Sequence, residues 1–443
     1  MEHSFSRSFQ SPSLVSAALL LIVVSLVPSE LKAQQFHGGK DYFDPIGLFL
    51  TWQQDPTTTM TIDWHIINED RNILEFRERG TGTWSDPITA RMIEFPFSDR
   101  TIQRVELTGL QPGTDYEFKF GESSKVYYFR TMPSDLSQPL RIAVGGDTMH
   151  RQKWMEKTAR QAMKYDIDFV FIQGDLAYAD GLSPEKQRQR DTQTPRAHNQ
   201  WYSFFNAYKN TLITDDYRVV PMVVTIGNHE IRGGYYFRDD RRPDDPAYSD
   251  TDEWKKEVAP YFFRLFAMPG LPGYNVLDFG DYLSLLLLDT DHANPVENQV
   301  AWIRQTLAER SQVPHLIPGY HVPAYPSVRN YNDEVQKRVR ELWVPEFEKG
   351  GVQLVFEAHD HAYKRTFPIR ENEVRSNGIV YVGDGAWGTE TREIASRQDY
   401  ENWYIVKAAS ERHFILLTLH GTQRHMKMIS STGKVLDEYP ETP

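Results

Sequence analysis

The chain has no cysteine among its 443 residues. Disulfide bonds are therefore excluded, and so is lipid attachment to a cysteine behind a leader segment. Stability must come from the size of the core, and the chain is long enough for about two or three domains. Apolar residues make up 40% of the sequence and aromatic residues 13%, as in a folded rather than a disordered protein.

Dense runs of lysine and arginine are also missing, and the formal net charge is −12. Because binding to nucleic acid depends on neutralising phosphates, no nucleic-acid partner is expected. A small phosphorylated substrate remains compatible with this charge, since bound cations would dominate the local field.

Long apolar runs are absent after the N-terminus. The one at the start follows Arg7, extends from Leu14 to Val27 and is followed by the small residue Ala33. Its length and flanks predict a signal peptide over residues 1–33 rather than a membrane-spanning helix. The mature protein is then expected to be secreted or periplasmic and not attached to a membrane. An uncleaved anchor is the alternative.

Residues 37–132 contain short runs of alternating apolar and polar side chains, separated by Gly, Pro and Asp. This pattern predicts an all-β sandwich of about 100 residues. The segment from Leu110 to Tyr116 resembles the tyrosine corner of fibronectin type III domains, and Trp52 and Trp64 are candidates for the core. The expected strands lie in LFLTWQQ, TMTIDWHI, ITARMIEF, TIQRVELTGL, DYEFKFG and VYYFRTM.

A polar linker from Pro133 to Gln138 leads into a second pattern, over residues 139–440. Strands here alternate with segments that carry apolar residues at helical spacing, namely KWMEKTARQAMKY, NQVAWIRQTLAER and NDEVQKRVRELW. Such alternation predicts a layered α/β domain. Two polar insertions, Asp180 to Asn199 and Arg232 to Asp252, are either binding loops or solvated surface.

Five apolar runs in this second region break at residues that bind metal ions. Each run is typical of a buried strand followed by a loop, and ligands bind at the carboxyl ends of such strands in open α/β sheets. The runs are RIAVGGD, FVFIQGDLAY, VVTIGNHE, HLIPGYH and LVFEAHDH. Together they carry Asp147, Asp175, Tyr178, Asn228, His229, His321, His359 and His361.

Each of these residues alone also has an ordinary structural interpretation. Asp175 suits the N-cap of a helix, Tyr178 suits a packing aromatic and His321 suits a buried core position. His359 and His361 alternate on an extended segment, yet both can reach a centre at the strand end. Five such strand ends together favour a shared site. Two metal ions about 3.5–4 Å apart supply the charge and the hydroxide that phosphoester hydrolysis needs.

These residues closely resemble the purple acid phosphatases, within the calcineurin-like metallophosphoesterases. The likeness covers nearly the whole mature chain and is most specific in GDLAYAD, GNHE and the segment His359-Asp360-His361. It implies an α/β layered metallophosphoesterase domain, a β-sandwich flanked by helices, over residues 139–440. An all-β fibronectin type III-like sandwich over residues 37–132 would precede it.

The resemblance also implies a role for each site residue. In the family pattern, one position holds Fe(III) and the other a divalent Fe, Zn or Mn ion. Asp147, Asp175, Tyr178 and His361 would hold the first ion, and Asn228, His321 and His359 the second, with Asp175 bridging. Tyr178 would give the purple colour. His229 would contact the phosphate and assist protonation of the leaving group.

Two positions depart from the family pattern. The usual Asp-x-Gly is here Asp147-Thr148-Met149, and related phosphodiesterases place a ligand His where Met149 stands. Met149 cannot replace that His as a ligand of a hard metal, which favours the purple type, and His150 is a weaker substitute. At the substrate mouth, where plant enzymes carry a His pair, the chain has Arg329, a candidate for bidentate phosphate binding.

The sequence therefore predicts an exported, metal-dependent phosphatase. It would cleave phosphate monoesters of small molecules by attack of a metal-bound hydroxide. A phosphodiesterase or nucleotide pyrophosphatase using the same centre is the main alternative. A third possibility is an inert adhesion protein that acts through its β domain. Larger members of the family are often dimeric, and without cysteine we expect a monomer or a homodimer that has no disulfide.

Overall fold

A computed structural model of the chain describes residues 42–68, 70–179, 197–231, 251–383, 385–394 and 402–440. The predicted signal peptide and most of both polar insertions lie outside these ranges. Within the described ranges, no helix is long and apolar enough to cross a membrane.

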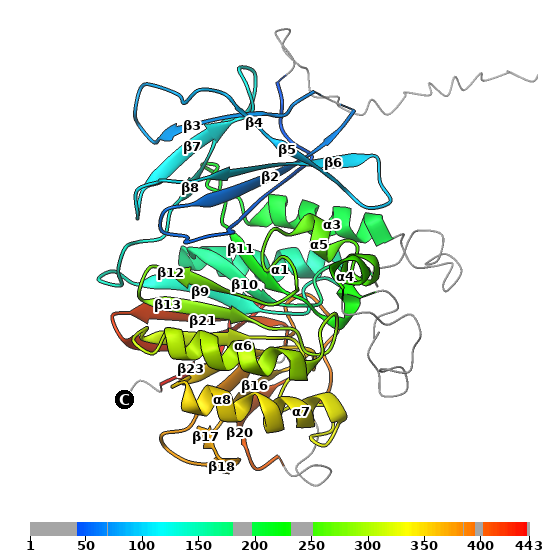
Figure 1. Cartoon of the computed structure of the whole chain (residues 1–443), viewed down its shortest axis with the longest axis vertical. Coiled ribbons are helices and arrows are strands. Elements are labelled where there is room, and N and C mark those ends of the chain that lie inside the picture. Colours follow the sequence, from blue (N-terminus) through cyan, green and yellow to red (C-terminus); the bar gives the residue numbers. More distant parts are fainter. Residues whose placement is uncertain are drawn as a thin grey trace, which may run out of the picture. The chain divides into compact units, whose positions relative to one another are not determined.

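Two antiparallel four-stranded sheets form the N-terminal domain in the described residues, drawn in blue and cyan in Figure 1. Their orders are β1-β2-β6-β5 and β4-β3-β7-β8. The run ITARMIEF divides at Ala90, because β4 pairs with β3 in one sheet and β5 with β6 in the other. Strand β3 is an addition to the predicted set. The bounds are β1 Gly47–Thr51, β2 Met60–Ile67, β3 Ile73–Glu78, β4 Ile88–Thr89, β5 Arg91–Glu94, β6 Arg100–Leu107, β7 Asp115–Lys119 and β8 Tyr127–Arg130.

The tyrosine corner is confirmed, since the Tyr116 hydroxyl accepts the backbone N–H of Gln111 at 2.9 Å. Trp64 is fully buried in the core of this domain against Phe120, with ring centroids 4.7 Å apart. Trp52 is also buried, but its ring packs on Phe169 and Phe279 from later in the chain. The expectation that both tryptophans fill the sandwich core is therefore right for Trp64 alone.

The later part of the chain forms two larger mixed sheets in the described residues. One has the order β11-β10-β9-β21-β22-β23 and the other β12-β13-β14-β15-β19-β16-β20, with a short β17-β18 ribbon beside them. The strand bounds are β9 Leu140–Gly145, β10 Phe169–Gln173, β11 Met222–Thr225, β12 Asn275–Phe279, β13 Leu283–Leu287, β14 His315–Gly319, β15 Leu354–Glu357, β16 Tyr363–Thr366, β17 Ile369–Arg370, β18 Glu373–Val374, β19 Val380–Gly383, β20 Ile405–Ala409, β21 His413–His420, β22 Gln423–Ser430 and β23 Val435–Tyr439.

Helices flank these sheets, and the three predicted helical segments are confirmed as α1, α6 and α7. Figure 1 shows α6, α7 and α8 lying together along the seven-stranded sheet, whereas α1 contacts β21 of the six-stranded sheet. Helix α3 lies beside α1 and also contacts β1. The helix bounds are α1 Gln152–Ala162, η1 Met163–Tyr165, α3 Ala197–Thr211, η2 Asn228–Glu230, α4 Asp252–Val258, α5 Phe262–Leu265, α6 Val296–Glu309, α7 Glu334–Leu342 and α8 Val344–Lys349.

The parallel strands of both sheets set the position of the site. In the first sheet, β10 pairs in parallel with both β9 and β11, and in the second β14 pairs in parallel with β15. Four of these five strands are buried throughout and β9 is buried except at Arg141, as expected of short apolar runs in parallel strands covered on both faces. The five predicted strands are therefore confirmed, and each is followed by a loop that carries candidate ligands.

Candidate metal centre

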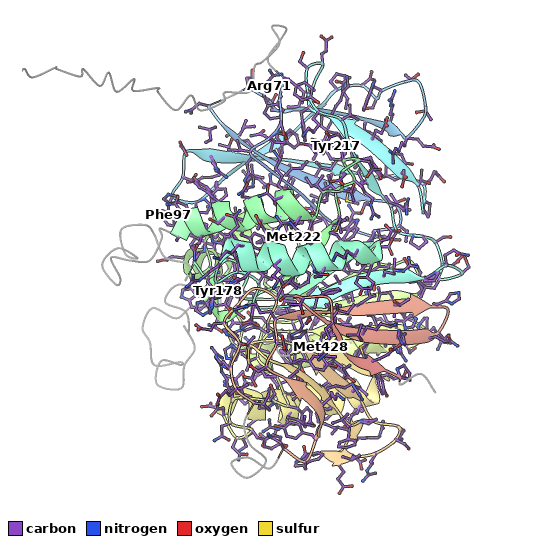
Figure 2. The ribbon with its side chains drawn as sticks, turned by 180° about the vertical axis from the view of Figure 1, so that it is seen from behind. Arg71, Phe97, Tyr178, Tyr217, Met222 and Met428 are labelled. Carbon is purple, nitrogen blue, oxygen red and sulfur yellow. The ribbon has the colours of Figure 1, made fainter. Side chains whose placement is uncertain are left out.

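The loops after these five strands bring all seven predicted ligands into two neighbouring groups. Asp147 follows β9, Asp175 and Tyr178 follow β10, and Asn228 follows β11. His321 follows β14, and His359 and His361 follow β15. All seven are buried, and Figure 2 marks Tyr178 at one end of the strand layers.

The first group contains Asp147, Tyr178 and His361. The Tyr178 hydroxyl donates to Asp147 Oδ1 at 2.8 Å and lies 3.0 Å from His361 Nε2. His361 Nε2 is also 2.9 Å from the same carboxylate oxygen. One oxygen of a carboxylate, one phenol oxygen and one imidazole nitrogen thus form a compact triangle.

The second group is centred on His321 Nε2. This atom lies 3.1 Å from Asp175 Oδ2, 3.1 Å from Asn228 Oδ1 and 3.0 Å from His359 Nδ1. A single N–H can serve only one of these three neighbours well, so hydrogen bonding alone leaves lone pairs facing one another. The Asn228 amide nitrogen has no hydrogen-bond partner in the described part of the chain.

Both groups fit metal ions. Donor atoms about 2.1 Å from one cation and in cis positions of an octahedral shell lie about 3 Å apart, which is the spacing seen in each group. The atoms of Asp175, His321 and His359 lie within 4.8 Å of one another, as a shared ion requires. Imidazole, carboxylate, amide and phenolate donors suit Fe, Zn and Mn.

The outer nitrogens of two histidines are held by backbone carbonyls. His321 Nδ1 lies 2.8 Å from the carbonyl of Gln173, and His361 Nδ1 lies 3.0 Å from the carbonyl of Glu390. A carbonyl only accepts, so each Nδ1 carries a proton, and in the neutral ring each Nε2 presents its lone pair to the centre. This arrangement is typical of metal-binding histidines.

The ionisable side chains of the two groups shift one another's pKa values. Burial would raise the pKa of Asp175, but His321 and His229 outweigh burial and lower it. Burial opposes the charge on His321, yet the neighbouring Asp175 raises the pKa of this imidazole to about 9. Burial and Asp147 raise the pKa of Tyr178 well above its usual value, so a tyrosinate here requires the charge of a cation.

His229 lies beside the candidate ligands, and its side chain belongs to neither donor group. Its side chain is 28% exposed, its Nε2 lies 3.9 Å from Asp175 Oδ2, and its ring lies over Tyr178 with centroids 4.3 Å apart. The backbone N–H of His229 donates to Asp175 Oδ1 at 2.8 Å. A partly exposed imidazole next to the metal ligands is well placed for contact with a substrate.

Glu230 and His150 take part in the site although the sequence pattern gave them no firm role. The Glu230 carboxylate accepts the backbone N–H groups of Asp175, Leu176 and Gly227, each at 2.8 Å, and so fixes the loop that carries Asp175. The position of Glu230 in GNHE was the available signal for it.

The ring of His150 packs edge-on against Tyr178, with centroids 4.2 Å apart, and lies 5.4 Å from the ring of His361. Its Nδ1 accepts the backbone N–H of Glu390 at 3.2 Å, which assigns the proton of the neutral ring to Nε2. Met149 is fully buried in the apolar core. His150, and not Met149, therefore contributes a polar group beside the centre.

Five of the seven ligands have left-handed backbone conformations, with φ between 52° and 78° at Asp147, Asp175, Tyr178, His359 and His361. Such values are uncommon for residues other than glycine and gather at functional sites. The alternative of a helix N-cap at Asp175 is therefore wrong, and so is the extended conformation expected for residues 359–361. Residues 174–179 are non-helical, and the turn at 359–361 directs both histidines to the centre.

Two family models match the chain. The model described as "Calcineurin-like phosphoesterase" matches residues 140–363, and the model described as "Purple acid Phosphatase, N-terminal domain" matches residues 45–131. The chain therefore belongs to the calcineurin-like phosphoesterases, whose fold is the layered sandwich described above. Its N-terminal strand-rich domain matches the purple acid phosphatase model, and the similar proteins include purple acid phosphatases.

Among similar proteins, purple acid phosphatase 15 of Arabidopsis thaliana is 26% identical over 65% of this chain and 54% of its own length. The chain thus spans little more than half of that relative. Acid phosphatase type 7 of Mus musculus is 24% identical over 97% of both chains. A purple acid phosphatase isolated from yellow lupin seeds has a TM-score of 0.67 at 20% identity, over 88% of this chain and 73% of that one, which shows the shared fold.

Proposed function

We propose that the chain is an exported acid phosphatase of the purple type, which hydrolyses phosphate monoesters of small molecules at a two-metal centre. The observation that carries the proposal is the pair of donor groups described above. Each consists of buried oxygen and nitrogen atoms about 3 Å apart, a spacing that suits metal coordination. Asp147, Tyr178 and His361 would hold Fe(III), Asn228, His321 and His359 would hold divalent Fe, Zn or Mn, and Asp175 would bridge them.

When bound, the two ions neutralise the phosphoryl oxygens and lower the pKa of water at the centre. The side chains of the protein do the remaining work. His229 is partly exposed and lies against Tyr178, so it can give a proton to the leaving oxygen. His150 carries its proton on Nε2 and can donate it in a hydrogen bond to a phosphoryl oxygen.

The visible absorption spectrum tests the metal assignment. Oxidised wild-type protein reconstituted with iron should show an absorption band in the purple region. The band should disappear in Tyr178→Phe, while metal analysis still finds iron in this variant. A colourless wild-type protein with full iron would refute the role of Tyr178. A colourless protein that holds two zinc or manganese ions would still be a two-metal hydrolase, but it would be closer in type to the related phosphodiesterases.

A second test concerns His229. We expect His229→Ala to lower kcat on a phosphate monoester by about 100-fold, a typical effect of removing a general acid, with the metal content unchanged. Loss of metal in this variant would instead make His229 a ligand. Comparing an aryl phosphate with the bis-aryl phosphate then decides the substrate class, because a strong preference for the diester would replace the proposed monoesterase by a phosphodiesterase.

Export rests on the apolar N-terminal segment alone. The N-terminal residue of the protein recovered from the medium or periplasm of its native host should lie just after Ala33. An intact N-terminus on membranes would show an uncleaved anchor.

A further inference from the structure

Two arginines from different loops meet at one backbone carbonyl beside the metal centre. Arg329 Nη1 and Arg392 Nη1 each donate to the carbonyl oxygen of His359 at 3.1 Å. Both residues are only partly buried, and the Arg329 side chain is 21% exposed. Their guanidinium groups therefore lie close to each other and to a residue whose ring belongs to the second metal group.

One of the two charges has a carboxylate partner. Arg329 Nη1 lies 3.3 Å from Asp360 Oδ1, and the other oxygen of Asp360 accepts the backbone N–H groups of Ser327 and Val328 at 2.8 and 2.7 Å. Asp360 is fully buried. It thus anchors the Arg329 loop to the turn between His359 and His361.

The second guanidinium, that of Arg392, is held by backbone groups. Among the described residues, no carboxylate pairs with Arg392, and its guanidinium donates to the neutral carbonyl of His359. Its backbone N–H donates to the carbonyl of His361 at 3.1 Å, which fixes Arg392 over the same turn.

Asp360 compensates one of the two charges, so the pair keeps a net positive charge, and a planar guanidinium pairs best with a bidentate oxyanion. The guanidiniums are held at the backbone oxygen of His359, whereas the metal group uses its ring Nδ1. They therefore lie next to a residue of the second donor group, at its backbone rather than at the ring nitrogen that this group uses.

We propose that Arg329 and Arg392 bind a second oxyanion of the substrate, a phosphate or a carboxylate, next to the phosphate that is cleaved. This inference rests on the proposed function and narrows it. Preferred substrates would be phosphoanhydrides and phosphorylated acids rather than phosphate esters of uncharged alcohols.

The test compares three stable ligands on the metal-loaded full chain by titration calorimetry. Methylphosphonate has one anionic group, phosphonoacetate adds a carboxylate, and methylenediphosphonate adds a second phosphonate. In Arg392→Gln we expect the affinities for both larger ligands to fall by about tenfold or more, and that for methylphosphonate by about threefold at most. The metal content, measured after each titration, must be unchanged.

Two further variants sharpen the comparison. Arg392→Lys keeps the charge but not the planar fork and should recover part of the affinity. Arg375→Gln is the matched control, because Arg375 is 43% exposed and pairs with Glu371 and Glu373 away from the centre. Loss of affinity for phosphonoacetate alone would identify the second group as a carboxylate, and loss for methylenediphosphonate alone as a phosphate.

Equal weakening of all three ligands would overturn the proposal, because Arg392 would then contact the reacting phosphate itself. No weakening of any ligand would also overturn it and leave Arg392 a structural role. Binding needs no turnover, so the outcome is separate from that of the phosphatase assay. A protein that binds the larger ligands through Arg392 but cleaves no phosphoester would disprove the proposed function and keep the anion pair.

Discussion

The backbone N–H of His359 donates to Asp147 Oδ2 at 2.8 Å, so a residue of one donor group positions a residue of the other. The first oxygen of the same carboxylate belongs to the first group, with Tyr178 and His361. Asp147 follows β9 of the six-stranded sheet and His359 follows β15 of the seven-stranded sheet. The hydrogen bond therefore joins the two sheets at the site.

This link predicts that the two metal positions do not behave independently. Asp147→Asn removes a charged ligand from the first position and weakens the acceptor that orients His359. We expect loss of the first ion and a fall in affinity for the second of about 10–100-fold, the usual effect of losing an orienting partner of a metal ligand. Metal analysis across a chelator titration measures both. Unchanged binding of the second ion would show that the link has no energetic role.

The packing of the His150 ring and the hydrogen bond from its Nε2 can be tested separately with one substitution. His150→Phe keeps an aromatic ring against Tyr178 and removes the Nε2 proton. Since a hydrogen bond to a charged oxygen contributes about 1.5–3 kcal/mol, kcat/KM for a monoester should fall by about tenfold or more. Metal content and the purple band should be unchanged. If turnover is also unchanged, His150 only packs beside the centre.

The close approach of Gly227 to Asp175 leaves no room for a side chain at residue 227. Its backbone is extended, with φ −121° and ψ −179°, a conformation open to any residue. A Cβ there would overlap the backbone nitrogen and the carboxylate of Asp175. Gly227→Ala should therefore displace Asp175, lower metal occupancy and destabilise the fold by about 1–3 kcal/mol.

The matched control is Gly82→Ala, because a Cβ at Gly82 would meet nothing within 4 Å. Thermal unfolding with metal analysis compares the two variants. Equal behaviour of both would mean that the loop after β10 can move away from the added methyl group.

The pH dependence of folding should carry a contribution from His65. Its ring is fully buried among Phe49, Phe95 and Phe205, and in the described residues neither ring nitrogen has a hydrogen-bond partner. Burial, with help from Arg100 and Arg104, lowers its pKa from 6.5 to about 3. The unfolded chain therefore takes up a proton below pH 6.5 that the folded chain refuses, and the folded state loses about 2 kcal/mol between pH 7 and pH 5.

Asp63 on the same strand acts in the opposite direction. Burial raises its pKa to about 6 despite the neighbouring Arg104, so the folded state gains a proton first and is favoured as the pH falls through 6. The contribution of His65 is isolated by comparing wild type with His65→Leu in denaturant at pH 7 and pH 5. The loss on acidification should be smaller in the variant by about 2 kcal/mol, and an equal loss in both would contradict the assignment.

The convergence of the seven candidate ligands could be predicted from the sequence because each follows an apolar run that ends a buried strand. Parallel strands end at the same edge, so residues far apart in the chain, such as Asp147 and His361, were expected to meet there. The family resemblance assigned them to the two ions. The helical segments followed equally well from apolar residues at regular spacing.

The backbone of the site could not be predicted. The positive φ values at Asp175 and His359 are imposed by surrounding contacts, and local preference alone favours other conformations for Asp and His. The anchoring of Arg392 at the carbonyl of His359 joins residues that share no local pattern. Trp52 was misplaced for a related reason, since alternation marks a residue as buried but does not say against which part of the chain.

The position of Trp52 makes the two domains a single cooperative unit. Its ring fills a space bounded by Phe169 on β10, the strand that leads to Asp175, and by Phe279 on β12. Neither domain can unfold without exposing apolar surface of the other. Calorimetry should therefore show one unfolding transition for both domains. Trp52→Ala, at a cost of about 3–5 kcal/mol, should weaken that coupling and reveal separate melting of the N-terminal strands. The N-terminal domain is thus coupled energetically to the strand that leads to Asp175, even though it supplies none of the seven candidate ligands.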